Sequence, residues 1–180
     1  LGYFLWTFLM LELFDCRGWR VVTVASIAHK FARIDFDNLM MDVGYDPTRS
    51  YLRSKLANLL FAQELHRRLE AAGSRIKSIA CHPGYSNTSL FEKTANPLSS
   101  LGQRVNAAVF GQKPERGAWP TVLAATDERA VPGGYYGPTG FFDARGRVGD
   151  AIIEKRARNE VTARRLWEVS EELVGEALKV

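Results

Sequence analysis

The feature that most constrains the fold is a pair of short apolar runs separated by a long helical pattern. VVTVAS, from Val21 to Ser26, is rich in β-branched residues, and a second run from Ile76 to Cys81 ends at Pro83-Gly84. Between them, the segment from Leu52 to Leu69 repeats leucine mainly at three- and four-residue steps, the period of one helix face. Two buried strands joined by a helix favour a parallel sheet covered by helices. We therefore expect an α/β fold.

Further patterns flank this central unit. Residues 1–14, LGYFLWTFLMLELF, predict a buried helix that is too short for a membrane span and lacks the charge pattern of a signal peptide. Downstream we expect helices in ERGAWPTVLAATDE and from Gly149 to Gly175, and a final short strand within Gly133 to Phe142. Residues 85–114 mix apolar with polar, Pro and Gly residues, which predicts a loop with short helices. Its apolar residues indicate either a lid over a pocket or a helix packed onto the sheet. No repeat or linker divides the chain, so residues 1–180 are expected to form a single domain.

Cysteine content and charge exclude several classes of function. Cys16 and Cys81 form no CxxC motif and accompany no His cluster, which predicts neither a disulfide framework nor a zinc site and favours a reducing compartment. The net charge is only +4, and the basic run from Glu154 to Arg165 is interleaved with acids, as is typical of a solvated helix face. We expect a cytoplasmic protein with a small-molecule substrate and without nucleic-acid binding, membrane span or metal.

Tyr51 and Lys55 are the first candidates for chemistry. Four residues apart on one helix, they lie on the same face. A tyrosine hydroxyl by itself exchanges protons poorly at neutral pH, and a nearby cation favours its phenolate form. The spacing therefore permits proton exchange with an alcohol or carbonyl oxygen, although YxxxK also occurs by chance.

Polar residues at two strand ends add to this pair. Ser26 ends one predicted strand and His82-Pro83-Gly84 ends the next, and ligands of parallel sheets lie outside the carboxyl ends of the strands. Each residue also has a purely structural interpretation, as a cap or an ordinary turn. A hydrolase in which His29 or His82 activates Ser26 is disfavoured, because no GxSxG elbow surrounds the serine and nothing places a carboxylate behind either histidine.

As an ordered set, VVTVAS, YLRSKLANLLFAQEL, ACHPGYSNT and GGYYGP resemble the carboxyl-terminal half of a short-chain dehydrogenase/reductase of the retinol-dehydrogenase-like branch. The resemblance extends from Leu1 to about Gly175. It implies a Rossmann-like, doubly wound parallel sheet that is incomplete, with the amino-terminal half of the fold absent. The family's Gly-rich turn, its ribose-reading residue, its NAG-type segment and its catalytic Asn have no counterpart in this sequence.

The resemblance also implies a role for each matching residue. Tyr51 would be the catalytic acid and base, Lys55 would tune it and bind the nicotinamide ribose, and Ser26 would donate a hydrogen bond to the substrate oxygen. Where the family often has another Ser before this one, the chain has Ala25. The remaining cofactor-binding candidates form the turn HPGYSNT after the second strand: Pro83, Gly84, Tyr85 and Thr88.

An NAD(P)-dependent oxidoreductase acting on an alcohol or carbonyl compound is the implied function, with NADP slightly favoured over NAD by the basic charge balance. The apolar residues after Thr88 favour a small, apolar substrate. The alternative is a truncated, non-catalytic fragment or binding subunit that retains the fold without binding cofactor. Activity of the 180 residues alone stays open. The resemblance makes a homo-oligomer one expected state, paired through the helix that carries Tyr51 and Lys55.

Overall fold

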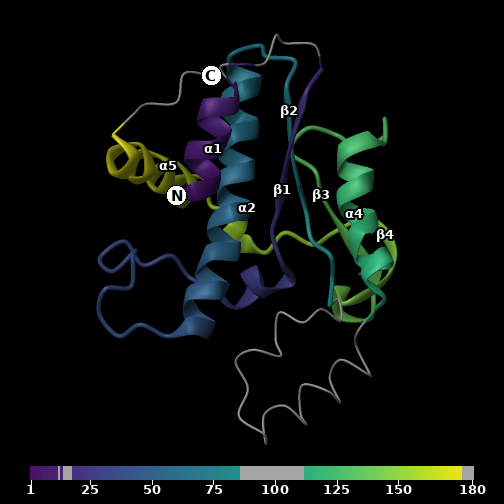
Figure 1. Cartoon of the computed structure of the whole chain (residues 1–180), viewed down its shortest axis with the longest axis horizontal. Coiled ribbons are helices and arrows are strands. Elements are labelled where there is room, and N and C mark those ends of the chain that lie inside the picture. The colour runs from purple at the N-terminus through teal and green to yellow at the C-terminus, as the bar shows by residue number, and fades with distance from the viewer. Residues whose placement is uncertain (12, 14–17, 86–111, 176–180) are drawn as a thin grey trace, which may run out of the picture.

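The computed structural model describes residues 1–11, 13, 18–85 and 112–175. Cys16, Thr88 and nearly all of the predicted lid lie outside these residues. In chain order (Figure 1), the elements are α1 (Gly2–Leu11), β1 (Arg20–Val24), the 3-10 helix η1 (Ile27–Phe31), α2 (Pro47–Ala71), β2 (Lys77–Cys81), α4 (Pro114–Thr126), β3 (Tyr135–Gly140), the short helix η3 (Phe141–Asp143), β4 (Arg145–Asp150), the short helix η4 (Lys155–Arg158) and α5 (Glu160–Val174).

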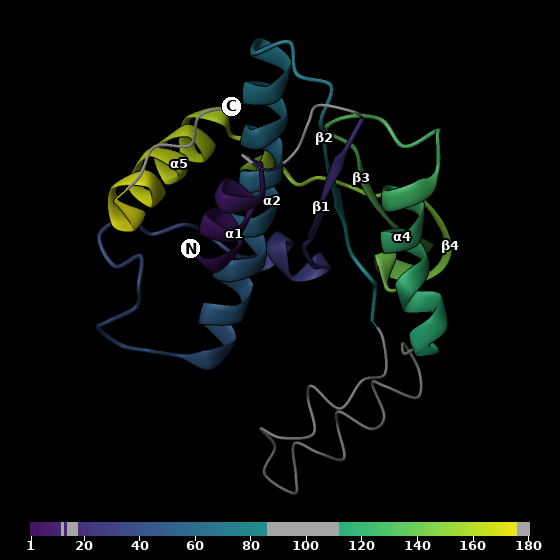
Figure 2. The same ribbon diagram turned by 45° about the horizontal axis from the view of Figure 1, so that its top comes forward.

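The described strands form one four-stranded sheet in the order β1-β2-β3-β4. β1 pairs with β2 and β2 with β3 in parallel, whereas β3 and β4 are antiparallel. Figures 1 and 2 show α1, α2 and α5 on one face of the sheet and α4 on the other. Helices on both faces of a mainly parallel sheet confirm the predicted doubly wound α/β class.

The end of the chain differs from the prediction. The helix expected from Gly149 begins only at Glu160, where Asn159 caps it. Gly149 and Asp150 belong to the antiparallel strand β4, and residues 155–158 form the separate short helix η4. The sequence of β4, RGRVGD, contains two glycines and one apolar residue, so it carries no strand pattern of its own. Its conformation comes from pairing with β3, from Tyr136 opposite Asp150 to Gly140 opposite Arg145.

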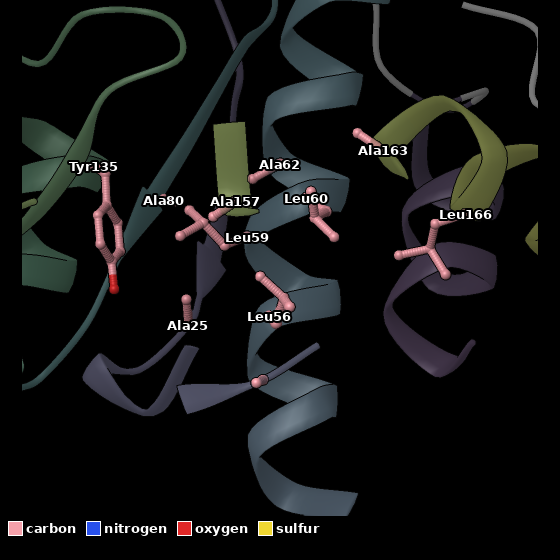
Figure 3. Packing of buried hydrophobic residues seen from close by; sticks show 11 residues of the cluster. Ala25, Leu56, Leu59, Leu60, Ala62, Ala80, Tyr135, Ala157, Ala163 and Leu166 are labelled. Carbon is pink, nitrogen blue, oxygen red and sulfur yellow. The ribbon is translucent and has the colours of Figure 1, made fainter. Parts of the chain in front are cut away.

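Helix α2 forms the centre of the larger core. Its buried apolar residues meet β2, β3 and the start of α5 in one cluster (Figure 3). The cluster comprises Ala25, Ala32, Leu56, Leu59, Leu60, Ala62, Ala80, Tyr135, Ala157, Ala163 and Leu166. Leu56, Leu59 and Leu60 of α2 are fully buried in this cluster. This packing fixes the rotation of α2 about its axis, and therefore the direction in which the other faces of its first turns point.

A second cluster attaches α1 and α5 to the far half of α2. The Trp167 ring stacks on Phe61, with ring centroids 5.7 Å apart, and meets Phe4 edge to face at 4.9 Å. Helix α1 is buried only on the face that carries Phe4 and Phe8, whereas Trp6 is exposed. Of the described helices, none has the length and apolarity that crossing a bilayer requires.

The amino-terminal cap of α2 supports the helix that carries Tyr51. The Asp46 carboxylate accepts a hydrogen bond of 2.7 Å from the Arg49 N–H, and Pro47 occupies the first helical position. We expect Asp46→Ala to lower the free energy of unfolding by about 1 kcal/mol, because that N–H loses its acceptor. Asp46→Asn is the matched control, since its amide oxygen still accepts. Urea unfolding followed by circular dichroism tests this, and equal stability of wild type and Asp46→Ala would contradict it.

Candidate active site

The ends of β1 and β2 bring two of the predicted segments side by side. Val24 pairs with Cys81, and the next N–H, of Ala25, donates to the Cys81 carbonyl oxygen at 2.8 Å. Ser26 and Pro83 each follow this last strand pair by two residues. The carboxyl ends of the two strands therefore present both segments at one edge of the sheet.

Ser26 begins the short helix η1 and is almost fully buried, with 9% of its surface exposed. Its Oγ accepts a hydrogen bond of 3.2 Å from the Ala28 N–H, so the capping role that the sequence allowed is present. A cap uses only a lone pair of the hydroxyl. The Ser26 O–H can still donate to another oxygen at the sheet edge.

Helix α2 places Tyr51 and Lys55 beside Ser26. The Tyr51 hydroxyl lies 3.5 Å from the Ser26 Oγ, and the Lys55 ammonium lies 5.7 Å from the centroid of the Tyr51 ring. The hydroxyl distance exceeds that of an ideal O–H···O bond, about 2.7–2.8 Å. Both hydroxyls can therefore turn toward one shared oxygen atom, and catalytic hydrogen bonds commonly tighten only in the bound complex.

Lys55 reaches the end of β1 from α2. Its Nζ donates to the Val24 carbonyl oxygen at 3.4 Å, and burial lowers the pKa of the ammonium. The same carbonyl accepts a second hydrogen bond, of 3.1 Å, from the Asn58 amide. Asn58 was missed by sequence reasoning, and the signal available was its position one turn after Lys55. Together the two side chains attach this face of α2 to the end of β1.

The turn after β2 depends on Gly84. Its φ of 68° is left-handed, and a Cβ there would overlap the Ala144 carbonyl oxygen. The Gly84 N–H donates to His82 Nδ1 at 3.2 Å, and the Tyr85 N–H donates to the Ala144 oxygen at 2.8 Å. The segment from His82 to Tyr85 is thus held against η3 and the start of β4.

The other side of this turn is held by Gln112. The Gln112 amide donates to the Pro83 carbonyl oxygen at 2.6 Å, and the Gln112 backbone N–H donates to the Tyr85 carbonyl oxygen at 2.9 Å. Pro83, Gly84 and Tyr85 therefore form a supported turn next to Ser26. Thr88, the fourth residue predicted for this turn, lies outside the described residues.

Two buried histidines flank Tyr135 behind the site. His29 meets the Tyr135 ring edge to face at 5.6 Å, and His82 lies 5.1 Å from it on a tilted plane. Burial lowers the pKa of both imidazoles, that of His82 to about 4. His29 contacts the carbonyl oxygen of Ser26, at 2.7 Å, and the amide of Gly84 contacts His82. These contacts are to backbone groups, which is unlike the Ser–His arrangement of a hydrolase.

Because His82 is buried, we expect the protein to lose stability in acid. Its folded pKa of about 4 lies below the ordinary 6.5, so the unfolded chain binds a proton first as the pH falls. The contribution of neutral His82 to the free energy of unfolding is fully present above pH 6.5. It is lost as the pH falls from 6.5 to 4, and the complete loss lowers the free energy of unfolding by about 3 kcal/mol. Urea unfolding at steps between pH 7 and pH 4 measures this slope. His82→Asn should flatten it, and an equal slope in both proteins would contradict the prediction.

No family model matches this chain. It is 36% identical to human Retinol dehydrogenase 11 over 177 residues, which cover 97% of the chain and 52% of that protein. It is 37% identical to human Retinol dehydrogenase 14 over 180 residues, with shares of 97% and 50%, and 35% identical to human Polyprenol dehydrogenase over 142 residues, with shares of 76% and 43%. The chain spans about half the length of the curated relatives it matches.

A solved structure shares the fold. The crystal structure of an uncharacterized protein from Mycobacterium paratuberculosis superimposes with a TM-score of 0.77 and is 35% identical. The match covers 99% of this chain and 57% of that protein. The arrangement of helices around the sheet is therefore shared with a longer chain.

Proposed function

This chain belongs to the short-chain dehydrogenase/reductase family, in its retinol-dehydrogenase-like branch, and from that premise we propose that it provides the proton-transfer site of an NAD(P)-dependent oxidoreductase. The reaction interconverts an alcohol and a carbonyl compound. The observation that supports the proposal most is the approach of the Tyr51 and Ser26 hydroxyls to 3.5 Å, with the Lys55 ammonium one helical turn further along.

The residues present fit the nicotinamide end of the cofactor. Among the described residues, the Lys55 ammonium has a backbone oxygen, that of Val24, as its hydrogen-bond acceptor. An ammonium has three donors, so Lys55 can also bind ribose hydroxyls. The supported turn of Pro83, Gly84 and Tyr85 lies at the neighbouring strand end and would face the nicotinamide. When bound, the nicotinamide supplies or accepts the hydride.

The protein's own residues would handle the proton and the charge. In the reductive direction, Tyr51 donates its hydroxyl proton to the carbonyl oxygen, and in the oxidative direction it takes the proton back. Ser26 donates a hydrogen bond to the same oxygen and stabilises the negative charge that develops there. The Lys55 ammonium stabilises the phenolate that Tyr51 becomes after giving up its proton.

An apolar substrate is part of the proposal. The relatives are named for retinol and polyprenol, which are apolar alcohols with a reactive terminal oxygen. The two hydroxyls would hydrogen-bond to one oxygen of the substrate, so the rest of the substrate needs no polar group. We extend this substrate class to the present chain as an apolar alcohol or aldehyde.

The test is a turnover assay on the whole purified protein, with retinaldehyde and with a short-chain aldehyde. Consumption of the reduced cofactor is followed by its absorbance, with NADH and NADPH in separate reactions. We expect consumption that depends on aldehyde, with a higher kcat/KM for retinaldehyde. Binding of neither cofactor would remove the proposal and favour the non-catalytic fragment or binding subunit. Tight binding of a cofactor without turnover of either aldehyde would contradict the proposed reaction.

A further inference from the structure

His29 makes contacts on both edges of its ring. It lies three residues after Ser26 in η1 and is 1% exposed. Its Nδ1 is 2.7 Å from the Ser26 carbonyl oxygen, and on the other side the backbone N–H of Glu154 points at Nε2 across 3.5 Å. The imidazole therefore connects the residue that carries the candidate catalytic hydroxyl with the segment that leads into η4.

One protonation state satisfies both contacts. The Glu154 N–H can only donate, so Nε2 must carry a lone pair, and the neutral ring then has its proton on Nδ1. The Ser26 carbonyl oxygen can only accept, which is what an Nδ1–H requires. Burial favours the neutral form of His29, in agreement with its lowered pKa. The edge-to-face contact with Tyr135 fixes the plane of the ring.

Hydrogen bonds hold the backbone before and after Ser26. One residue before it, the Ala25 N–H donates to the Cys81 carbonyl oxygen of β2. On the carboxyl side, the Ser26 carbonyl oxygen accepts from the His29 ring and, at 3.1 Å, from the His29 backbone N–H. The direction of the Ser26 hydroxyl toward Tyr51 follows from this backbone orientation, because a buried N-cap serine has little rotational freedom left.

We propose that His29 is a positioning residue that holds the Ser26 hydroxyl in register with Tyr51 by binding the Ser26 carbonyl oxygen with its Nδ1–H. The inference rests on the proposed function, since it concerns the same oxygen-binding pair. His29 does not contact the reacting atoms. Its effect passes through the backbone of Ser26, and small displacements of a catalytic group are known to lower rates strongly.

Two substitutions at His29 separate positioning from packing. Asn carries a donor the same number of bonds from Cβ as Nδ1, whereas Leu fills similar space without any donor. We expect His29→Leu to lower kcat about 100-fold while the Kd for NADPH stays unchanged. His29→Asn should recover most of the lost kcat. His66→Leu is the matched control, because His66 lies fifteen residues after Tyr51 in α2, about 22 Å along the helix axis, and should leave kcat unchanged.

A double-mutant cycle shows whether the effect passes through Ser26. In a Ser26→Ala background, His29→Leu should cause little further loss of kcat, since the hydroxyl that it positions is gone. A full additional loss in that background would overturn the inference. So would wild-type kcat in His29→Leu, or equal kcat in His29→Leu and His29→Asn.

Two controls separate the role of His29 from misfolding and from failure of the proposed function. Thermal unfolding is measured for each variant. Should His29→Leu not fold, His29→Gln replaces it, because its amide reaches the Nε2 position and lacks a donor at Nδ1. The expected order of kcat is then Asn above Gln, and the reverse order overturns the inference. Tyr51→Phe is assayed in parallel: retained turnover there refutes the proposed function, whereas its loss beside an active His29→Leu refutes only the role of His29.

Discussion

Replacing Tyr51 with phenylalanine is expected to lower kcat by about 10²–10⁴-fold, the range that a positioned general acid contributes. Phenylalanine keeps the ring in α2 and removes only the hydroxyl that lies 3.5 Å from the Ser26 Oγ. The Lys55 ammonium keeps its contact with the Val24 carbonyl oxygen, so the proposed ribose-binding group stays in place. The Kd for NADPH should therefore be unchanged, although kcat falls.

The control for Tyr51→Phe is Tyr45→Phe. Tyr45 lies before α2 and is 66% exposed, so loss of its hydroxyl should change neither kcat nor Kd. Single-turnover kinetics measure the chemical step, and NADPH fluorescence titration measures the binding. Wild-type turnover in Tyr51→Phe would remove Tyr51 from its proposed role. A parallel loss of NADPH affinity would instead indicate a structural effect on the cofactor site.

The second large effect is expected at Lys55. Lys55→Met keeps an unbranched side chain in the half-buried site and removes the ammonium. Hydrogen bonds to charged groups contribute about 1.5–3 kcal/mol, so the Kd for NADPH should rise about 10- to 100-fold. The rate should fall as well, because the phenolate form of Tyr51 loses the neighbouring cation.

Lys77→Met is the matched control for Lys55→Met. Lys77 begins β2 at the end of the sheet opposite the candidate site, so its ammonium should contribute to neither binding nor rate. Kd is measured by NADPH fluorescence, and kcat at saturating cofactor. Wild-type NADPH affinity in Lys55→Met would contradict the ribose contact. A normal kcat at saturation combined with a raised Kd would limit Lys55 to cofactor binding.

Strands β1 and β2 and the long helix α2 could be predicted because their signals are local. The β-branched run of β1, the leucine period of α2 and the Pro-Gly stop after β2 each lie within one short segment. In the described part of the chain, these elements have the predicted type and order. Strand β4 could not be predicted, since its glycines and arginines become a strand only by pairing with β3.

The candidate site also has a part that the sequence predicted and a part that it did not. Spacing on α2 was enough to place Tyr51 and Lys55 on one face, and strand ends were enough to associate Ser26 with the turn at Pro83. Their catalytic and cofactor-binding roles stay predictions. Asn58 and the His29 ring make contacts between segments far apart in the chain, such as those of Glu154 and Ser26. No pattern in one of these segments predicts a contact with the other.

The sequence by itself therefore determined which residue types stand at the strand ends and along one helix face, because periodicity and turn chemistry are properties of neighbouring residues. Only the tertiary structure decided that the Tyr51 hydroxyl lies 3.5 Å from the Ser26 Oγ and that the His29 ring contacts the Ser26 carbonyl oxygen. Such distances depend on how α2, β1 and the segment before η4 are packed together. Packing joins residues across long sequence separations, where local patterns carry no information.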